Sequence, residues 1–252
     1  MSADGDLLLT VNSNDQPIPS ALRVPDKITP ERTGAFFGRR KGKKLRSGQD
    51  DLIQNLLPAI RVIPGSAPSG QFPNANARET WLEIGFGGGE HLAAQARTHP
   101  DINLIGCEPF VNGMAKLLAT IDQEKLDNVR VWDDDVTKLL PTLPDACFNR
   151  VYILYPDPWP KRRQRKRRLV SDEMLDMLAR VMKPGAELRF ASDIDDYIGW
   201  VLARTLRSDQ FRWTAKRADD WRKPYEGWPG TRYEAKAIRE GRVPSYLTFV
   251  RI

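Results

Sequence analysis

Glu83-Ile84-Gly85-Phe86-Gly87-Gly88-Gly89-Glu90 is a glycine-rich turn between an apolar segment, 81–84, and a segment of helical composition, 90–97. In a doubly wound α/β sheet such a turn lies beside a ligand, because glycines let the ligand approach the backbone next to a helix N-terminus. A dinucleotide site needs Gly-x-Gly-x-x-Gly, but counting from Gly85 places Glu90 last, where a carboxylate opposes a pyrophosphate. The turn therefore favours a ligand other than a dinucleotide.

The segments that follow this turn alternate between strand and helix patterns. Predicted strands cover 81–84, 103–107, 129–132, 150–154, 187–191, 211–216 and 245–252, and predicted helices cover 90–97, the region around 114–121, 171–181 and 197–206. This order predicts an α/β fold, a Rossmann-like doubly wound, mostly parallel seven-stranded sheet with helices on both faces. In the strand order 3-2-1-4-5 the first and fourth strands are neighbours, so the loops after them face one crevice.

The rest of the chain predicts the domain boundaries. Residues 1–33 contain scattered prolines and no hydrophobic period, so we expect a disordered N-terminal tail. Residues 34–252 are expected to form one domain with a basic N-terminal extension. Within it, Ser47 can cap a short helix that ends at Pro58. The segment 64–79, rich in Pro, Gly, Ser and Asn, is expected to be a flexible connection.

Positive charge is concentrated in two windows, although the formal net charge is only +6. Residues 39–46 hold six basic side chains and residues 161–168 hold seven, with no acid in either window. Because these account for thirteen of 39 basic residues, the remaining chain has more acids than bases. Two basic patches on an otherwise acidic protein are typical of a surface that binds nucleic acid, and two solvated loops are the alternative.

The composition argues against a membrane protein and against a metal site. No apolar run approaches the roughly 18 residues that cross a bilayer, and residues 1–10 lack the positive start of a secretory signal. A cytoplasmic location is therefore expected. Cys107, Cys147, His91 and His99 are too few for a zinc site or a disulfide framework. We expect His91 to be a surface residue, and the oligomeric state stays open.

Three acids fall where a cationic ligand could use them. The spacing Glu-x-Gly-x-Gly-x-Gly from Glu83 is typical of S-adenosylmethionine-dependent methyltransferases, whose ligand carries a sulfonium and an α-amino group. Glu108 ends the second predicted strand, from which a carboxylate can accept hydrogen bonds from ribose hydroxyls. Asp135 follows the third strand and could accept from an adenine amine. Helix capping is the alternative for Glu108 and Asp135.

The fourth predicted strand is followed by Tyr155-Pro156-Asp157-Pro158-Trp159-Pro160. Each proline has a fixed φ and restricts the preceding residue to extended conformations, so we expect Tyr155, Asp157 and Trp159 on a rigid, extended loop. A carboxylate and an indole beside the basic window 161–168 suggest a site that holds a nucleic-acid base. Trp159 could stack on that base or cover the loop as part of the core.

With this loop and Lys161, residues 34–252 resemble the bacterial tRNA (guanine-N7-)-methyltransferases. The other marks are Ala191-Ser192-Asp193 and Thr231-Arg232-Tyr233-Glu234. The resemblance implies methyl transfer from S-adenosylmethionine to N7 of guanosine 46 in the tRNA variable loop. It implies cofactor contacts from Glu83, Glu108, Asp135 and Asp157, and substrate contacts from Lys161, Asp193, Thr231, Arg232, Tyr233 and Glu234. The glycine turn adds Gly85 to the expected cofactor contacts, and Asp157 is the catalytic candidate. Tyr155 stands where some members have phenylalanine, and Ala-Lys-Ala after Glu234 replaces Gln-Arg-Gly.

The chemistry of guanine agrees with this family. Guanine N7 carries an in-plane lone pair, so methyl transfer to it needs positioning rather than a general base. Asp157 could accept hydrogen bonds from guanine N1–H and N2–H, which adenine cannot supply. Thr231 and Glu234 also form a capping-box pattern, and Asp193 could be a helix N-cap. A methyltransferase for another RNA base, a non-catalytic RNA-binding protein and an NAD-dependent oxidoreductase are the alternatives.

Overall fold

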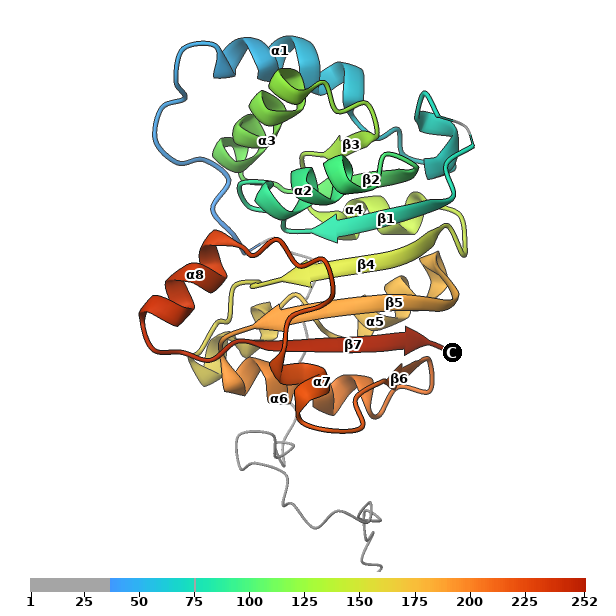
Figure 1. The fold of residues 1–252 in the computed structure, drawn as a ribbon, viewed down its shortest axis with the longest axis vertical. Coiled ribbons are helices and arrows are strands. Elements are labelled where there is room, and N and C mark those ends of the chain that lie inside the picture. The colour runs from blue at the N-terminus through green and yellow to red at the C-terminus, as the bar shows by residue number, and fades with distance from the viewer. Residues whose placement is uncertain (1–36, 75) are drawn as a thin grey trace, which may run out of the picture.

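One seven-stranded sheet forms the centre of the computed structural model, which describes residues 37–74 and 76–252 (Figure 1). The strands are β1 (Glu79–Ile84), β2 (Ile102–Cys107), β3 (Val129–Trp132), β4 (Phe148–Leu154), β5 (Met182–Ser192), β6 (Phe211–Trp213) and β7 (Ser245–Arg251). Their order is β3-β2-β1-β4-β5-β7-β6, with β1 to β5 parallel and β7 antiparallel to both neighbours. The predicted fold class is confirmed, and the predicted tail, 1–33, lies outside the described residues.

The centre of the sheet is buried on both faces, which explains the apolar runs in the sequence. All six residues of β2 are buried, as expected of a parallel strand covered by helices on either side. β1 pairs with β2 on one side and with β4 on the other, where Ile84 lies opposite Ile153. The strand order therefore reverses between β1 and β4, and the loops after these two strands leave the same edge of the sheet.

Helices cover both faces (Figure 1). They are α1 (Gln49–Ile60), α2 (Glu90–Thr98), α3 (Val111–Glu124), α4 (Val136–Leu139), α5 (Asp172–Val181), α6 (Asp195–Thr205), α7 (Asp219–Arg222) and α8 (Arg232–Arg239), with 3₁₀ turns η2 (Pro68–Gln71), η3 (Leu140–Thr142) and η4 (Arg162–Arg167). Side chains of α1, α2 and α3 join one hydrophobic cluster and those of α4, α5 and α6 join another. Within the described ranges, none of these helices combines the length and apolarity needed to cross a membrane.

Two boundaries differ from the sequence-based expectation. α1 follows Gly48, which has a φ of 84° and provides no side-chain cap, so the predicted Ser47 cap is wrong, and Pro58 lies inside the helix. β5 begins at Met182, five residues before the predicted strand 187–191, because Met182 pairs with Phe148. An irregularity in register between Phe148 and Arg150 accommodates Pro184 and Gly185.

The connection 64–79 is more ordered than its composition suggests. It contains η2, and Phe72 is buried in a core cluster. The Arg130 guanidinium lies 4.9 Å from the centre of the Phe72 ring, and its Nε donates to the Gln71 carbonyl over 2.7 Å. The prediction of a flexible connection is therefore wrong for 68–72, where one aromatic side chain fastens the segment to the core.

Candidate active site

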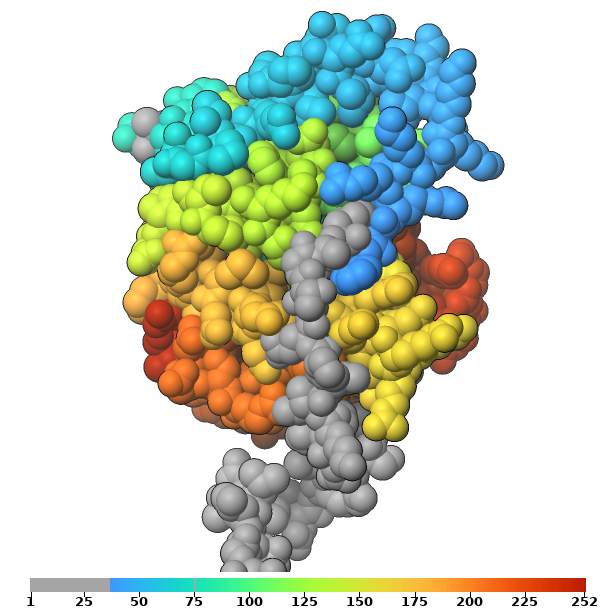
Figure 2. All heavy atoms as spheres, turned by 180° about the vertical axis from the view of Figure 1, so that it is seen from behind, coloured from blue at the N-terminus to red at the C-terminus, as the bar shows by residue number. Residues whose placement is uncertain are grey.

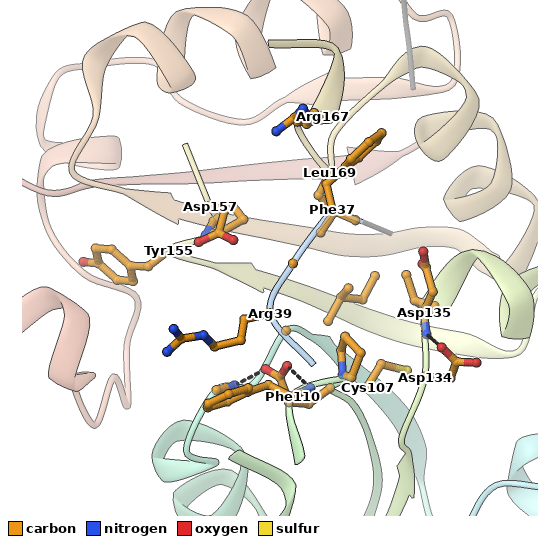
Figure 3. Close-up of a pocket in the computed structure, with 18 of the residues that line it drawn as sticks. Phe37, Arg39, Cys107, Phe110, Asp134, Asp135, Tyr155, Asp157, Arg167 and Leu169 are labelled. Atoms are coloured by element: carbon orange, nitrogen blue, oxygen red, sulfur yellow. Dashed lines mark hydrogen bonds between the residues drawn. The ribbon is translucent and has the colours of Figure 1, made fainter. Parts of the chain in front are cut away.

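An open pocket of about 310 Å³ lies at the carboxyl edge of the parallel strands (Figure 3). The glycine turn after β1 contributes Gly85 and Gly87, and the loop after β4 contributes Tyr155, Pro156, Asp157 and Trp159. The ends of β2 and β3 add Cys107, Glu108, Asp134 and Asp135. The crevice expected between the first and fourth strands is therefore present, because adjacent parallel strands deliver their following loops to one place.

The glycine turn is shaped by backbone conformations that suit glycine. Gly85, Gly87 and Gly89 have φ values of 77°, 61° and 80°, which side chains other than glycine rarely adopt. A Cβ at Gly85 would meet nothing within 4 Å, so this part of the turn is open toward the pocket. A Cβ at Gly113 of α3 would lie 2.1 Å from the Gly87 carbonyl oxygen. The turn is thus packed tightly against α3 and leaves a backbone cradle on its other side.

Glu108 stands at the floor of this cradle. Its two carboxylate oxygens accept hydrogen bonds from the backbone N–H groups of Gly87, over 2.8 Å, and Phe110, over 2.9 Å (Figure 3). Burial raises the pKa of Glu108, while these two N–H groups and the Arg232 guanidinium act in the opposite direction. The carboxylate orientation is therefore fixed by the protein before any ligand arrives.

Asp134 and Asp135 extend the acidic side of the pocket from the end of β3. Asp135 is buried and caps α4 by accepting from the Thr137 N–H over 3.0 Å, so it both lines the pocket and fulfils the capping alternative. Although partial burial opposes ionisation, hydrogen bonds from Lys138, the Asp135 amide and Arg40 lower the pKa of Asp134 to about 2. Asp134 is therefore an ionised anchor for neighbouring cations.

Glu83 faces away from the pocket's lining residues and toward His91. Its Oε2 lies 2.7 Å from His91 Nδ1, and both side chains are buried. The His91 ring also contacts the rings of Tyr152, at 4.7 Å, and Trp228, at 5.1 Å. The prediction of a surface histidine is wrong because the first turn of α2 folds back over β1. The residues that bury it come from distant parts of the chain, so no local signal could have shown this.

The proline loop does not have the extended backbone that was predicted. Tyr155 has a φ of 49° and Trp159 a φ of 43°, although each precedes a proline. Tertiary hydrogen bonds hold this geometry: the Tyr155 N–H donates to the Ala191 carbonyl over 2.8 Å, and Arg168 Nε donates to the Pro158 carbonyl over 2.8 Å. Each such residue costs on the order of 1–3 kcal/mol, which the surrounding contacts must offset.

Asp157 lies between these two residues and is exposed at the pocket mouth. In Figure 3 it stands above Arg39, with Phe110 below. Removal of solvent by the surrounding loop raises the pKa of Asp157. Trp159 also lines the pocket, and the Arg167 guanidinium lies 5.0 Å from the centre of its ring. Trp159 therefore lies on the pocket wall and outside the two hydrophobic core clusters, and its stacking on a base stays a prediction.

Residues 37–43, here called the roof segment, cross the pocket and were not recognised as part of the site from the sequence. Phe37, Gly38 and Arg39 line the pocket. The Arg167 guanidinium, already beside Trp159, lies 5.1 Å from the Phe37 ring, and Figure 2 shows the blue roof segment beside the yellow loop. Asn112 fastens the other end by accepting from the Gly42 N–H over 2.6 Å and donating to the Lys43 carbonyl over 2.7 Å.

The basic window 161–168 contains two kinds of side chain. Lys161, Arg162, Arg163 and Lys166 are exposed. Arg168 is buried, pairs with Asp196 and packs against the rings of Tyr197 and Trp200, at 4.8 and 5.0 Å. Arg165 also pairs with Asp196, over 2.6 Å. The expectation that this basic window forms a nucleic-acid-binding surface is wrong for Arg168, because that cation holds the proline loop against α6.

Within the segment Thr231 to Glu234, two side chains bond inside the protein and Tyr233 lies at the pocket. Thr231 and Glu234 form a capping box at the start of α8. The buried Glu234 carboxylate also accepts from Trp228 Nε1, over 2.7 Å, and from the Tyr246 hydroxyl. Tyr233 lines the pocket and is exposed.

Two further residues with expected substrate roles lie away from the pocket lining. Asp193 Oδ2 accepts from Arg242 Nε over 2.5 Å, and the N-cap of α6 is Ile194 rather than Asp193. Lys161 is exposed at the start of η4.

In the part of the chain that the structure describes, no group of three or more His, Cys, Asp and Glu side chains could hold a metal ion. The pocket lining combines acids, glycines and aromatic rings with two arginines, Arg39 and Arg167, and several apolar side chains.

Comparisons with known proteins point in one direction. Residues 77–245 match a family model described as "Putative methyltransferase". The chain is 55% identical over 227 residues to a tRNA (guanine-N(7)-)-methyltransferase of Chelativorans sp. (strain BNC1), covering 88% of this chain and 98% of the relative. It is 55% identical over 223 residues to the protein of the same name from Agrobacterium fabrum, covering 87% and 96%. Among solved structures, the 16S rRNA methyltransferase KamB matches with a TM-score of 0.52 and 18% identity, over 72% of this chain and 95% of that chain.

Proposed function

The chain belongs to the tRNA (guanine-N(7)-)-methyltransferases, and from this premise we propose that it transfers a methyl group from S-adenosylmethionine to N7 of guanosine 46 in the variable loop of tRNA. The observation that supports this most is the single pocket in which the open glycine cradle faces the loop carrying Asp157. A methyl donor and a target base must meet within bonding distance, and the two halves of such a site meet here.

The residues of the glycine side fit an adenosyl sulfonium ligand. The open backbone at Gly85 admits close approach, and Glu108 presents a carboxylate already oriented by two N–H groups. Each Glu108 oxygen keeps a lone pair that can accept from a ribose hydroxyl, and Asp135 is placed to accept from the adenine amine. Glu83 supports the turn from behind through His91. When bound, the donor supplies an electrophilic methyl group on positively charged sulfur.

Asp157 is the residue that selects and steadies the base. Its carboxylate accepts hydrogen bonds from guanine N1–H and N2–H. Holding this edge of the ring orients N7 on the other side, and no general base is needed because N7 carries no proton. As N7 uses its lone pair to form the new bond, positive charge develops on the guanine, and the nearby carboxylate stabilises it. Removing solvent around Asp157 strengthens that interaction, at the cost of the raised pKa described above.

The remaining substrate contacts follow from exposure. Lys161, with the exposed arginines and lysine of η4, binds tRNA phosphates as point charges, and the exposed basic side chains of the neighbouring roof segment bind further phosphates. Tyr233 contacts the base or its neighbour from the pocket mouth. Thr231, Glu234 and Asp193 act by holding α8 and the strand ends in position, since their side chains already bond within the protein.

The test is incubation of the purified protein with unmodified tRNA and donor labelled in its methyl group, followed by nucleoside analysis. We expect 7-methylguanosine, at no more than one methyl per tRNA. The matched control is the same transcript with adenosine at position 46, which should accept no label. Label on another base, or undiminished label in the control transcript, would contradict the proposed reaction.

A further inference from the structure

A guanidinium lies against the glycine turn at Gly87, the residue whose N–H group bonds Glu108. Arg232 is the first residue of α8, and a Cβ built on Gly87 would lie 3.2 Å from its Nη2. Its Nη1 lies 3.7 Å from Glu90 Oε1, and its Nη2 lies 3.2 Å from the Tyr233 hydroxyl. Arg232 therefore lies against the glycine turn, beside the pocket-lining residues Gly87 and Tyr233, although it is about 145 residues away from Gly87 along the chain.

The position of Arg232 is fixed by the protein interior. The capping box orients the start of α8, and Glu234 ties that helix to Trp228 and Tyr246. The Trp228 ring in turn lies 5.1 Å from the His91 ring, and His91 bonds Glu83 immediately before the glycines. One connected set of buried and half-buried side chains thus joins the start of α8 to the underside of the turn, so the backbone that carries Arg232 is held beside Gly87.

The acids around the glycine turn would repel the carboxylate of a ligand, and Arg232 is a cation that can offset this repulsion. Glu108 and Glu90 are anionic neighbours of the cradle, and Arg232 opposes the rise in the pKa of Glu108. An amino acid-bearing ligand must place its own α-carboxylate beside this acidic turn, and a nearby cation is needed to make that favourable. Arg232 can provide two parallel N–H groups to a carboxylate, a geometry that lysine does not reproduce.

We propose that Arg232 binds the α-carboxylate of the methyl donor, and so belongs to the donor site rather than to the tRNA contacts. This inference rests on the proposed use of S-adenosylmethionine. It also gives α8 a function: the helix places one residue, Arg232, on the donor and the next, Tyr233, at the mouth where the target base enters. Donor binding and base binding thereby share a single rigid element.

The test compares two ligands with two proteins by calorimetry in the absence of tRNA. S-adenosylmethionine and its decarboxylated analogue share the sulfonium and adenosine and differ in the carboxylate. Wild-type protein should prefer the carboxylate-bearing ligand by about 10- to 100-fold, the range for a charge-assisted pair. In Arg232→Ala this preference should fall below about threefold, while affinity for the decarboxylated ligand changes little. Arg232→Lys should recover only part of the preference.

Three controls keep the inference open to refutation. Arg239→Ala, in the last turn of the same helix, should keep the wild-type preference. Arg39 also lines the pocket, so loss of the preference in Arg39→Ala but not in Arg232→Ala would assign the carboxylate to the roof segment and overturn the proposal. Thermal melting checks that each variant is folded, and Arg232→Gln, with a similar stem, replaces the alanine variant if that one is not.

A full preference retained by folded Arg232→Ala or Arg232→Gln would refute the role of Arg232. A separate outcome bears on the proposed function: if wild-type protein binds neither ligand, the choice of donor is wrong. Affinity for unmodified tRNA, measured without donor, should change less than threefold in Arg232→Ala. A large loss of tRNA affinity with an unchanged donor preference would place Arg232 among the tRNA contacts instead.

Discussion

The two walls of the pocket reach the same backbone conformation by opposite means. In the glycine turn, Gly85 and Gly87 adopt positive φ without a steric cost, and the open side of Gly85 faces the pocket. In the proline loop, Tyr155 and Trp159 adopt positive φ in spite of their side chains. The two walls therefore present different groups: the glycine turn offers bare backbone to a ligand, and the proline loop keeps its aromatic rings at the cost of backbone strain.

The acids of the two walls differ in burial and in how firmly the protein orients them. Glu108 is buried and oriented by two backbone N–H groups, whereas Asp157 is exposed at the mouth. A buried, oriented carboxylate suits a small ligand of constant shape. An exposed carboxylate with a raised pKa suits a group that must arrive from solvent on a large partner. Substitutions at four positions test this contrast between the glycine turn, which would bind the donor, and the proline loop, which would act on the target base.

The largest effect is expected for Asp157→Asn. If Asp157 selects and steadies the guanine, kcat should fall by about 100- to 1,000-fold, with a much smaller change in donor affinity. Wild-type activity should also decline as pH falls through the raised pKa of Asp157, and the residual activity of Asp157→Asn should not follow that decline. Wild-type kcat in the variant would show that the working group lies elsewhere.

Asp157→Asn is expected to lower activity without lowering the stability of the fold. Because the surrounding loop removes part of the solvent and so raises the folded pKa of Asp157, the stability associated with the protonated form is present at low pH and lost as pH rises through that pKa. At neutral pH the Asn variant should therefore melt no lower than the wild type, which separates loss of activity from loss of folding. A melting temperature well below that of the wild type would show that the carboxylate also stabilises the loop.

Gly113→Ala tests the glycine wall from behind. Alanine is favoured over glycine within a helix by about 1 kcal/mol, but its Cβ would lie 2.1 Å from the Gly87 oxygen, and such overpacking costs about 1–3 kcal/mol. We expect a net loss of stability in urea denaturation and weaker donor binding. Gly70→Ala is the control, since a Cβ there meets nothing within 4 Å, and its effect should stay within about 0.5 kcal/mol.

A pair of variants at Tyr155 isolates the strain of the proline wall. Tyr155→Ala and Tyr155→Gly both lose the ring. They differ in whether a Cβ must occupy a φ of 49°, and in the greater freedom of glycine in the unfolded chain, which offsets part of that difference. The glycine variant should be the more stable of the two by about 1 kcal/mol. Gly85→Ala, at a φ of 77°, should cost a similar amount on the other wall. Equal stabilities of the Tyr155 pair would mean that the loop relaxes to an ordinary conformation.

The smallest effect is expected for Lys161→Gln, beyond the end of the proline wall. Loss of one phosphate contact should reduce the slope of log affinity for tRNA against log salt concentration by about 0.7–0.9. Lys183→Gln is the matched control, because Lys183 lies near the start of β5, at the edge of the sheet opposite the pocket. An equal change in both variants would show that the slope reports overall charge rather than a local contact.

Local patterns were enough to predict the strands, the glycine turn and the placement of Glu108 and Asp157. Each depends on neighbours within a few residues and on the ordered path of a parallel sheet. The positive φ of Tyr155 was not predictable, because it depends on a hydrogen bond to Ala191 in another strand. Neither was the burial of Arg168, since one cation in a run of cations gives no sign that Asp196 lies beside it.

The roof segment has a practical consequence for handling the protein. Arg39, Arg40, Lys41 and Lys43 are trypsin cleavage sites within this segment, which lines the pocket through residues 37–39 and is fastened by Asn112 and by the stacked Arg167. Cleavage requires a segment to open locally, and a ligand beneath the roof would hold it closed. Limited digestion can therefore follow occupancy of the pocket without a label, and the order in which ligands protect the chain would reveal the order in which they bind.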